Sequence, residues 1–414
     1  MPHSYTRPSM SPSDRPILTL PRTVFFLGVV SLLTDASSEM IYPLLPLFLA
    51  SSLGVGPAFI GVIEGVAEST AGLVKFFSGW WSDRLGRRKA LVVAGYSLSA
   101  CARPLVAVAG AGWHVLAIRF SDRVGKGLRT APRDALLAAS TAPDARGRAF
   151  GFHRAMDHTG AVLGPLIAFA LLSTVINDLR TLFALAAIPG LLAVGVLVWR
   201  VHEPPIPTSS APPPPRLSLA PFSGRFRAVL LVITLFTLGN SSDAFLLLKA
   251  HAVGIDAASI PLLWIVLHLS KAVSSMPAGV LSDRIGRPRL ILAGWMVYAT
   301  VYAGFALADQ AWQVWALFVW YGLFFGLTEG VEKAYVADLA PPAHRGTAFG
   351  LYHAAVGLAA LPASILMGVV WERAGAGPAF WLGAGLALCS ALGFLLVLAM
   401  PVREPASGPE HFKR

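Results

Sequence analysis

Long apolar segments are the feature that most constrains how this chain can fold. They recur throughout the 414 residues, and each has about the twenty residues that an α-helix needs to cross a membrane. Only 13% of the residues are charged and 55% are hydrophobic, whereas a soluble domain is about 25% charged. We therefore expect an all-α membrane protein. The twelve predicted transmembrane helices lie near residues 23–50, 58–81, 89–110, 113–140, 147–174, 181–200, 227–250, 258–281, 289–308, 312–338, 347–371 and 378–401.

The loops between these segments alternate in charge. Those after the second, fourth, eighth and tenth segments are basic and read RLGRRK, PDARGR, DRIGRPR and PAHRG. The opposite loops carry almost no basic residue, with Arg180 and Arg373 as exceptions. Because Lys and Arg collect on the cytoplasmic side, we predict a multi-pass protein of the cell (inner) membrane with both termini in the cytoplasm. This topology accounts for most of the net charge of +11, so we expect a lipid bilayer and no nucleic acid as partner.

A proline-rich stretch divides the chain into two halves. EPPIPTSSAPPPPRLSLAP is rich in Pro and Ser, which predicts an extended linker. Both cysteines, Cys101 and Cys389, lie in apolar segments, so we expect no disulfide framework, metal cluster or cofactor. The predicted organisation is a disordered cytoplasmic tail (1–22), an N-terminal six-helix bundle (23–202), a cytoplasmic linker (203–226), a C-terminal six-helix bundle (227–402) and a cytoplasmic tail (403–414).

Three motifs of the first half return in the second half in the same order. GWWSDRLGRRK (79–89) returns as GVLSDRIGRPR (279–289), and RGRAFG (146–151) returns as RGTAFG (345–350). DASSEM on the first segment has a weaker counterpart, GNSSDA, on the seventh. The copies lie about two hundred residues apart, which indicates duplication of a six-span unit. Since both halves start on the cytoplasmic side, we predict parallel repeats about an axis along the membrane normal.

The loop motif G-x-x-x-D-R-x-G-R-R-K resembles the signature loop of the major facilitator superfamily. The degenerate second copy, the six-plus-six layout and the proline-rich linker are similar to that family too. The resemblance implies secondary transport and two six-helix pseudo-repeats around a central cavity, lined by the first, fourth, seventh and tenth spans. These are the four segments that we expect to be the least apolar. GAVLGP (160–165) resembles the family's antiporter motif, although packing of small residues explains it equally well.

The fourth segment carries many charges for a membrane span. Its cations recur every three or four residues, which places them on one face of a helix. A charge exposed to lipid at the bilayer centre costs about 3 kcal/mol, so this face must meet protein or water. We predict that it binds substrate in the cavity; the alternative is that the cations pair with acids elsewhere. The residues are Arg119, Arg123, Lys126 and Arg129.

Polar residues on other spans are candidates for the same cavity. Carboxylates inside a membrane are suited to carry protons, although each could instead form a static ion pair. For proton coupling we predict Asp35 or Glu39 first, then Asp157 and Glu332. The other predicted substrate-binding residues are Tyr42, Asn240, Asp243, Glu329, Glu332 and Lys333.

The two copies of the signature loop are candidates for a latch between helix ends. Aspartate is favoured at a helix N-terminus, and arginines form charge-assisted bonds to carboxylates. The alternative is that these charges only set topology. In the resembled family the latch has an acidic partner near the inner end of span four; that place is Ala139 here, and Asp134 could substitute. The predicted gating residues are Gly79, Asp83, Arg84, Gly86, Arg87, Arg88, Asp134, Asp283, Arg284, Gly286, Arg287 and Asp338.

The sequence lacks the common motifs of hydrolytic and nucleotide-binding enzymes, namely HExxH, GxSxG, the P-loop and CxxC. We therefore expect a secondary active transporter, not an enzyme. The cations of the fourth segment favour a small anionic or zwitterionic organic solute, moved by proton-coupled efflux through a monomer. If the acids neutralise these cations, a proton-coupled exporter of drugs or cationic compounds fits equally well. Uptake of an organic anion and a membrane receptor without transport are the remaining alternatives.

Overall fold

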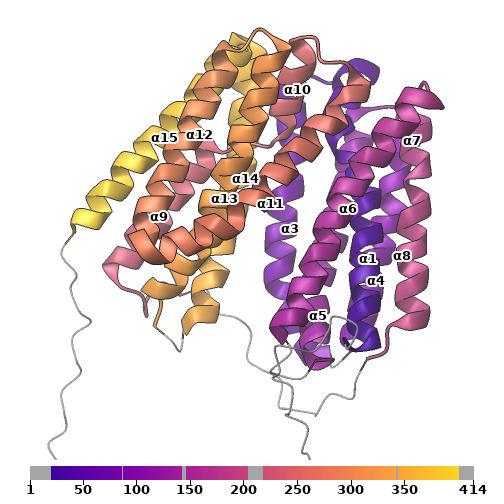
Figure 1. Ribbon diagram of the computed structural model, residues 1–414, viewed down its shortest axis with the longest axis horizontal. Helices are drawn as coiled ribbons and strands as arrows, with labels where there is room; N and C mark the ends of the chain where they lie inside the picture. The colour runs from indigo at the N-terminus through magenta and orange to yellow at the C-terminus, as the bar shows by residue number, and fades with distance from the viewer. Residues whose placement is uncertain (1–19, 86, 142–145, 204–217, 342–343, 401–414) are drawn as a thin grey trace, which may run out of the picture.

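The computed structural model describes residues 20–85, 87–141, 146–203, 218–341 and 344–400. Within them, all regular secondary structure is helical, and the helices form two groups that stand side by side (Figure 1). Nearly all of the two predicted tails and the centre of the predicted linker lie outside these residues. Eleven of the described helical segments are long and apolar enough to cross a membrane.

The first half of the chain forms the first six membrane-length helical segments. Its first span is interrupted, since α1 continues through short turns of different helical pitch. The bounds are α1 (Arg22–Glu39), η3 (Tyr42–Leu44), α2 (Leu45–Leu47), η4 (Phe48–Ser52), α3 (Pro57–Leu85), α4 (Arg88–Ala102), η5 (Arg103–Val108), α5 (Gly112–Ala139), α6 (Arg146–Thr174), α7 (Leu179–Leu185) and α8 (Ala187–Arg200).

The second half repeats this arrangement. Its first span is again interrupted, because α9 ends before the polar residues 240–243 and α10 completes the crossing. The bounds are α9 (Gly224–Gly239), α10 (Ala244–Ala252), η7 (Ala257–Ser259), α11 (Ile260–Ile285), α12 (Arg287–Leu307), α13 (Ala311–Leu339), α14 (Arg345–Ala374) and α15 (Ala376–Ala399).

The two interruptions occur at the motif pair DASSEM and GNSSDA. In the first span, Pro43 and Pro46 follow the end of α1, and proline removes the amide that would continue the helical hydrogen bonds. In the seventh span, Asn240 to Asp243 separate α9 from α10. Non-helical backbone at membrane depth is tolerated where it lines a cavity, and residues of both interruptions line the cavity described below.

The halves touch mainly through two pairs of helices, α3 with α14 and α6 with α11, and also where α2 and η3 of the first span meet α10 and α11. They meet toward the upper edge of Figure 1 and diverge toward the lower edge, where α1 begins. We call the end at which α3 begins and α14 ends the closed end, and the end at which α1 begins and α15 ends the open end.

Contact at the closed end is tight because small residues face each other. A Cβ atom on Gly61 of α3 would lie 2.2 Å from the carbonyl oxygen of Ser364 on α14, so a larger residue would separate the helices. The Glu372 carboxylate of α14 accepts a hydrogen bond of 3.0 Å from the backbone amide of Ala58. An acid at the N-terminus of α3 is also favoured by the helix dipole.

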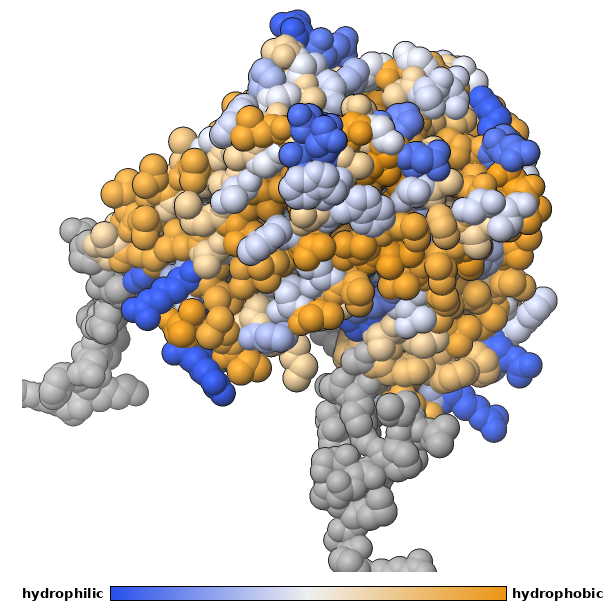
Figure 2. Space-filling model, turned by 45° about the horizontal axis from the view of Figure 1, so that its top comes forward, coloured by the Kyte–Doolittle hydropathy of each residue, from blue (hydrophilic) through white to orange (hydrophobic). Residues whose placement is uncertain are grey.

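The outer surface suits a lipid environment except at its margins. Figure 2 shows a broad band of apolar side chains across the molecule, with hydrophilic side chains gathered mainly toward its upper and lower margins.

Of the twelve described membrane-length segments, α5 alone is too charged to count among the eleven apolar ones. The expectation that the first, seventh and tenth spans are also the least apolar is wrong for the first and the seventh, whereas the tenth is among the less hydropathic segments. The least hydropathic of the eleven is Pro57–Ser78 in α3, which carries the acids that pair with α5.

Candidate functional site

A cavity of about 1180 Å³ lies between the two halves. The polar residues of its wall come from α1, α3, η5, α5 and α6 in the first half, and from the seventh span, α11, α13 and α14 in the second. Most of the predicted site residues line it. They are Asp35, Glu39, Tyr42, Arg119, Arg123, Lys126, Arg129, Asp157, Asn240, Asp243, Glu329 and Lys333.

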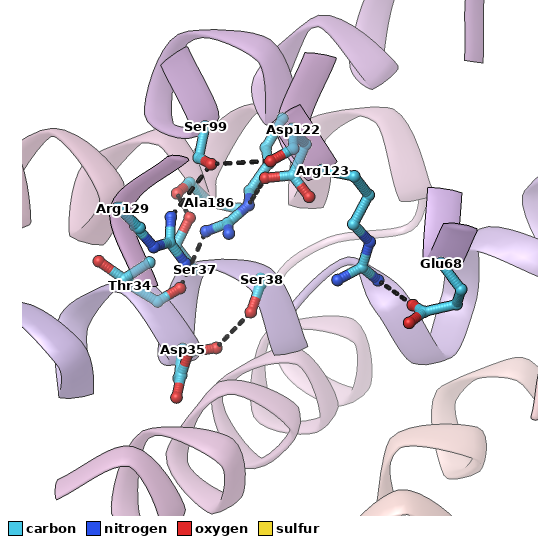
Figure 3. Close-up of polar contacts among 11 residues, drawn as sticks. Thr34, Asp35, Ser37, Ser38, Glu68, Ser99, Asp122, Arg123, Arg129 and Ala186 are labelled. Atoms are coloured by element: carbon cyan, nitrogen blue, oxygen red, sulfur yellow. Dashed lines mark hydrogen bonds and ion pairs between the residues drawn. The ribbon is translucent and has the colours of Figure 1, made fainter. Parts of the chain in front are cut away.

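The cations of α5 are largely paired within the first half. Arg119 lies 2.7 Å from Glu64, and Arg123 lies 3.1 Å from Glu68, both acids being on α3. Figure 3 shows Arg123 reaching toward Glu68, away from the other labelled arginine, Arg129. These two pairs reduce the net charge that a ligand would meet on this face of α5.

Deeper in the wall, a second network joins α1, α4 and α5. Arg103 donates to Asp122 at 2.8 Å and to the carbonyl of Thr34 at 3.0 Å. Arg129 donates to Ser99 at 3.0 Å (Figure 3), and its guanidinium lies 4.2 Å from the centre of the Tyr96 ring. The sequence prediction missed Arg103, whose signal was a lone arginine beside a proline in an apolar segment.

Lys126 differs from the arginines of its helix. Its side chain is exposed to the cavity and has no hydrogen bond or ion pair among the described residues. It is therefore the cation of α5 that is most available to a ligand.

In the second half, Trp264 and Phe325 line the cavity among polar side chains, and the buried Tyr321 bonds to an acid of this lining. Trp264 of α11 donates to the Glu39 carboxylate at 2.7 Å and so bridges the halves, and its ring lies 5.1 Å from that of Tyr42. Tyr321 of α13 donates to Asp243 at 2.5 Å. The sequence prediction missed Trp264 and Tyr321, because an aromatic residue in a membrane helix carries no local sign of a polar partner.

Further along α11 and α13, two lysines reach the cavity. The ammonium of Lys271 lies 3.7 Å from the centre of the Phe325 ring, a cation–π contact. Lys333 pairs with Glu329 one turn away at 3.4 Å.

Glu332 does not lie where the sequence predicted. It is buried but does not line the cavity, and it accepts hydrogen bonds from Trp295 at 2.9 Å and Tyr352 at 3.2 Å. A step of three residues turns about 60° around a helix, which is enough to direct Glu332 toward α12 while Glu329 faces the cavity. We therefore remove Glu332 from the candidate substrate-binding residues.

The remaining predicted coupling acids lie where α1 meets α6. Asp157 accepts a hydrogen bond from Ser31 and lies 3.6 Å from His153 and 3.7 Å from Arg154. The carboxylate of Asp35 also lines the cavity, and in the part of the chain that the structure describes it has no side-chain partner.

The predicted latch has different geometry in the two halves. In the second half, Arg287 pairs with Asp338 and lies 3.7 Å from Asp283, so it ties the start of α12 to the ends of α13 and α11. Gly286 between α11 and α12 has φ of +93°, a conformation that glycine allows, which makes the tight turn. Arg284 lies in the last turn of α11.

In the first half, the acidic partner is one that the sequence prediction missed. Glu203, after α8, accepts hydrogen bonds from the backbone amides of Arg88 at 2.7 Å and Lys89 at 3.2 Å, and so caps α4. Asp134 pairs with the adjacent Arg133 at 2.8 Å. The side chains of Asp83 and Arg84, the surroundings of Gly79 and all of Gly86 lie outside what the structure describes.

Comparison with known proteins agrees with this architecture. Residues 27–249 and 229–414 match the Major Facilitator Superfamily. The chain belongs to this family. It is therefore a multi-pass membrane transporter of the secondary class, and it is not an enzyme.

Named relatives of this transporter fall into two groups. An uncharacterised MFS-type transporter of Methanocaldococcus jannaschii is 34% identical over 384 residues, which cover 91% of this chain and 95% of the relative. The multidrug resistance protein MdtH of Cronobacter sakazakii is 24% identical over 328 residues, covering 79% and 81% of the two chains.

Solved structures share the fold. The nucleoside transporter NupG has a TM-score of 0.77 at 15% identity and covers 92% of this chain and 100% of its own. A bacterial homolog of the human lysosomal transporter Spinster, inward-facing and unoccupied, has a TM-score of 0.74 at 15% identity and covers 93% and 97%. At this identity the likeness establishes the two-bundle fold alone.

Proposed function

We propose that this transporter exports a small anionic or zwitterionic organic solute in exchange for protons, by alternating access. The observation that carries the proposal is the cavity between the halves, which both halves line with charge and which the contact of α3 with α14 closes at one end. Two halves around a polar cavity are what alternating access requires. The free lysine on α5 favours an acidic group on the solute.

We place the open end of the bundles in the cytoplasm. The basic loops that follow α3 and α11 lie at this end, and basic residues collect on the cytoplasmic side. Both termini are then cytoplasmic, and the structure represents the state that accepts a solute from inside the cell.

Asp35 is our first candidate for the coupling acid, followed by Glu39 and Asp157. It lines the cavity, and the described structure has no ion pair that would hold its carboxylate in the charged form. A proton entering from the opposite side could therefore neutralise it, and its release on the cytoplasmic side would complete the exchange.

Export of cationic compounds is the second candidate function. It is favoured by the relatedness to MdtH proteins, which are named for multidrug resistance, and by the pairing of Arg119 and Arg123 with acids. Glu39 and Asp243 would then bind the solute.

A thermal-shift screen of the purified protein separates the two functions. Matched anionic, neutral and cationic solutes are compared at two pH values, because a ligand of the folded state raises the melting temperature. Selective stabilisation by anions or zwitterions supports the proposal. Selective stabilisation by lipophilic cations supports the second candidate and contradicts the first.

A further inference from the structure

The charged residues of the cavity wall divide into those with a partner of opposite charge and those without one. Arg103, Arg119 and Arg123 each have an acidic partner within 3.1 Å. As neutral pairs, they add little net charge for a ligand. The groups without such a partner determine what charge the cavity can bind.

Two acids toward the closed end bond only to neutral groups. Glu39 accepts from the Trp264 indole and Asp243 from the Tyr321 hydroxyl, and neither has a cation within ion-pair distance in the described residues. The rings of Tyr42 and Trp264 lie 5.1 Å apart beside Glu39. Carboxylates beside aromatic faces are the surroundings that a ligand ammonium group prefers.

Three lysines that line the cavity have no acidic partner among the described residues, namely Lys75 of α3, Lys126 of α5 and Lys271 of α11. Lys126 and Lys271 come from opposite halves, and the ammonium of Lys271 lies against the Phe325 ring. Between Trp264 and Lys271 on α11, the Nε2 atom of His268 is buried without a hydrogen-bond partner and also lines the cavity. An acidic ligand group between Lys126 and Lys271 would neutralise two charges that the protein leaves unpaired.

The lysines and the aromatic acid site lie at different depths. The Tyr42 ring contacts Arg119 at 5.2 Å and Trp264 at 5.1 Å, so these residues lie at one level. Lys126 follows Arg119 by seven residues on α5, and Lys271 follows Trp264 by seven residues on α11. Both helices run toward the open end, and at about 1.5 Å per residue the lysines start about 10 Å nearer to it.

We propose that the cavity binds an elongated zwitterion, with its ammonium group at Glu39 and Asp243 and its acidic group between Lys126 and Lys271. This inference rests on the proposed transport of an anionic or zwitterionic solute and names its subclass. Because the lysines belong to opposite halves, an acidic ligand group bound between them also draws α5 and α11 together on the side of the open end. Solute binding thereby favours closure of the open end.

Four probes of similar size test the spacing of the charges. They are 6-aminohexanoate, which has separated charges; norleucine, whose charges share one carbon; hexanoate, which has only the acid; and hexylamine, which has only the amine. Apparent Kd values come from the dependence of the thermal shift on probe concentration. We expect 6-aminohexanoate to bind about tenfold tighter than each of the other three, since it alone fills both subsites.

Charge-neutral variants assign each subsite. Lys126→Met and Lys271→Met should each weaken 6-aminohexanoate about tenfold and leave hexylamine unchanged. Glu39→Gln, which keeps an acceptor for Trp264, should weaken 6-aminohexanoate and leave hexanoate unchanged. Lys249→Met is the matched control, because Lys249 lies on α10 away from the cavity lining.

The outcomes separate this inference from the function on which it rests. Tighter binding of hexanoate than of 6-aminohexanoate overturns the zwitterion site and still supports transport of an anion. Tighter binding of hexylamine overturns both. Equal binding of 6-aminohexanoate and norleucine, or a preference that survives both lysine substitutions, overturns the two-level arrangement.

Discussion

The two halves of this transporter share a backbone arrangement and differ in the side chains that pack inside each bundle. Buried ion pairs hold α3, α4 and α5 of the first half together, among them Arg119 with Glu64 and Arg103 with Asp122. In the second half, aromatic rings occupy the corresponding core, as in the stack of Tyr298 on Tyr302 at 4.1 Å. Duplication thus preserved the helix order and the loop motif while the interiors of the two halves acquired different chemistry.

This difference has consequences for function. In the first half, paired charges hold α5 against α3, and the ammonium group of Lys126 on α5 has no ion pair among the described residues. The second half lines the cavity with the rings of Trp264 and Phe325 among polar side chains, and Trp264 donates to an acid of the first half. A solute in the cavity would therefore meet charge from both halves, paired with opposite charge at Arg119 and Arg123 in the first half and set beside aromatic groups at Asp243 and Lys271 in the second.

The largest effect should come from charges that face the cavity in the first half. Arg123→Ala and Asp35→Asn should each abolish transport in proteoliposomes while leaving membrane insertion intact, since one removes the partner of Glu68 and the other the proposed proton carrier. Asp309→Asn, in an exposed loop of the second half, is the control. Full transport by both Arg123→Ala and Asp35→Asn would remove these residues from the site.

Removing one partner of a buried ion pair in the first half should lower the free energy of unfolding strongly. Glu64→Ala leaves the buried Arg119 without its acid and should lower the free energy of unfolding by about 3 kcal/mol. The measurement is the melting temperature in detergent. The double variant Glu64→Gln with Arg119→Gln should recover part of the loss, and an unchanged melting temperature in Glu64→Ala would show that the pair is not structural.

A comparable change in the aromatic core of the second half should cost less. Tyr321→Phe removes the hydroxyl that donates to Asp243 and keeps the ring packing, so we expect a loss of about 1 kcal/mol. The same melting experiment checks it. A loss as large as that of Glu64→Ala would mean that the interiors of the two halves do not differ as proposed.

The smallest expected loss of stability distinguishes the predicted latch of the second half from that of the first. Asp338→Asn removes the acid that joins Arg287 to α13 and should cost up to about 1 kcal/mol, because the pair is partly exposed. Asp134→Asn in the first half should have less effect, since among the described residues its ion pair is with the neighbouring Arg133. Paired melting curves of the two variants make the comparison, and a larger loss in Asp134→Asn would contradict it.

Much of this architecture follows from the sequence by itself. Twenty-residue apolar segments, alternating loop charges and motif copies about two hundred residues apart are local or repeating signals, so they predict the helices and the two halves without knowledge of contacts. The charged face of α5 is likewise visible, because helical periodicity places its cations on one side. Within α5, sequence alone could not distinguish the paired arginines from the free Lys126.

Only the tertiary structure shows which groups these charged side chains contact. Arg103 meets Asp122 and Glu203 caps α4 across separations that no local pattern encodes. Glu329 faces the cavity whereas Glu332, three residues later, bonds to Trp295. The rotation and relative depth of each packed helix determine such contacts, and these are set by the packing of all its neighbours at once.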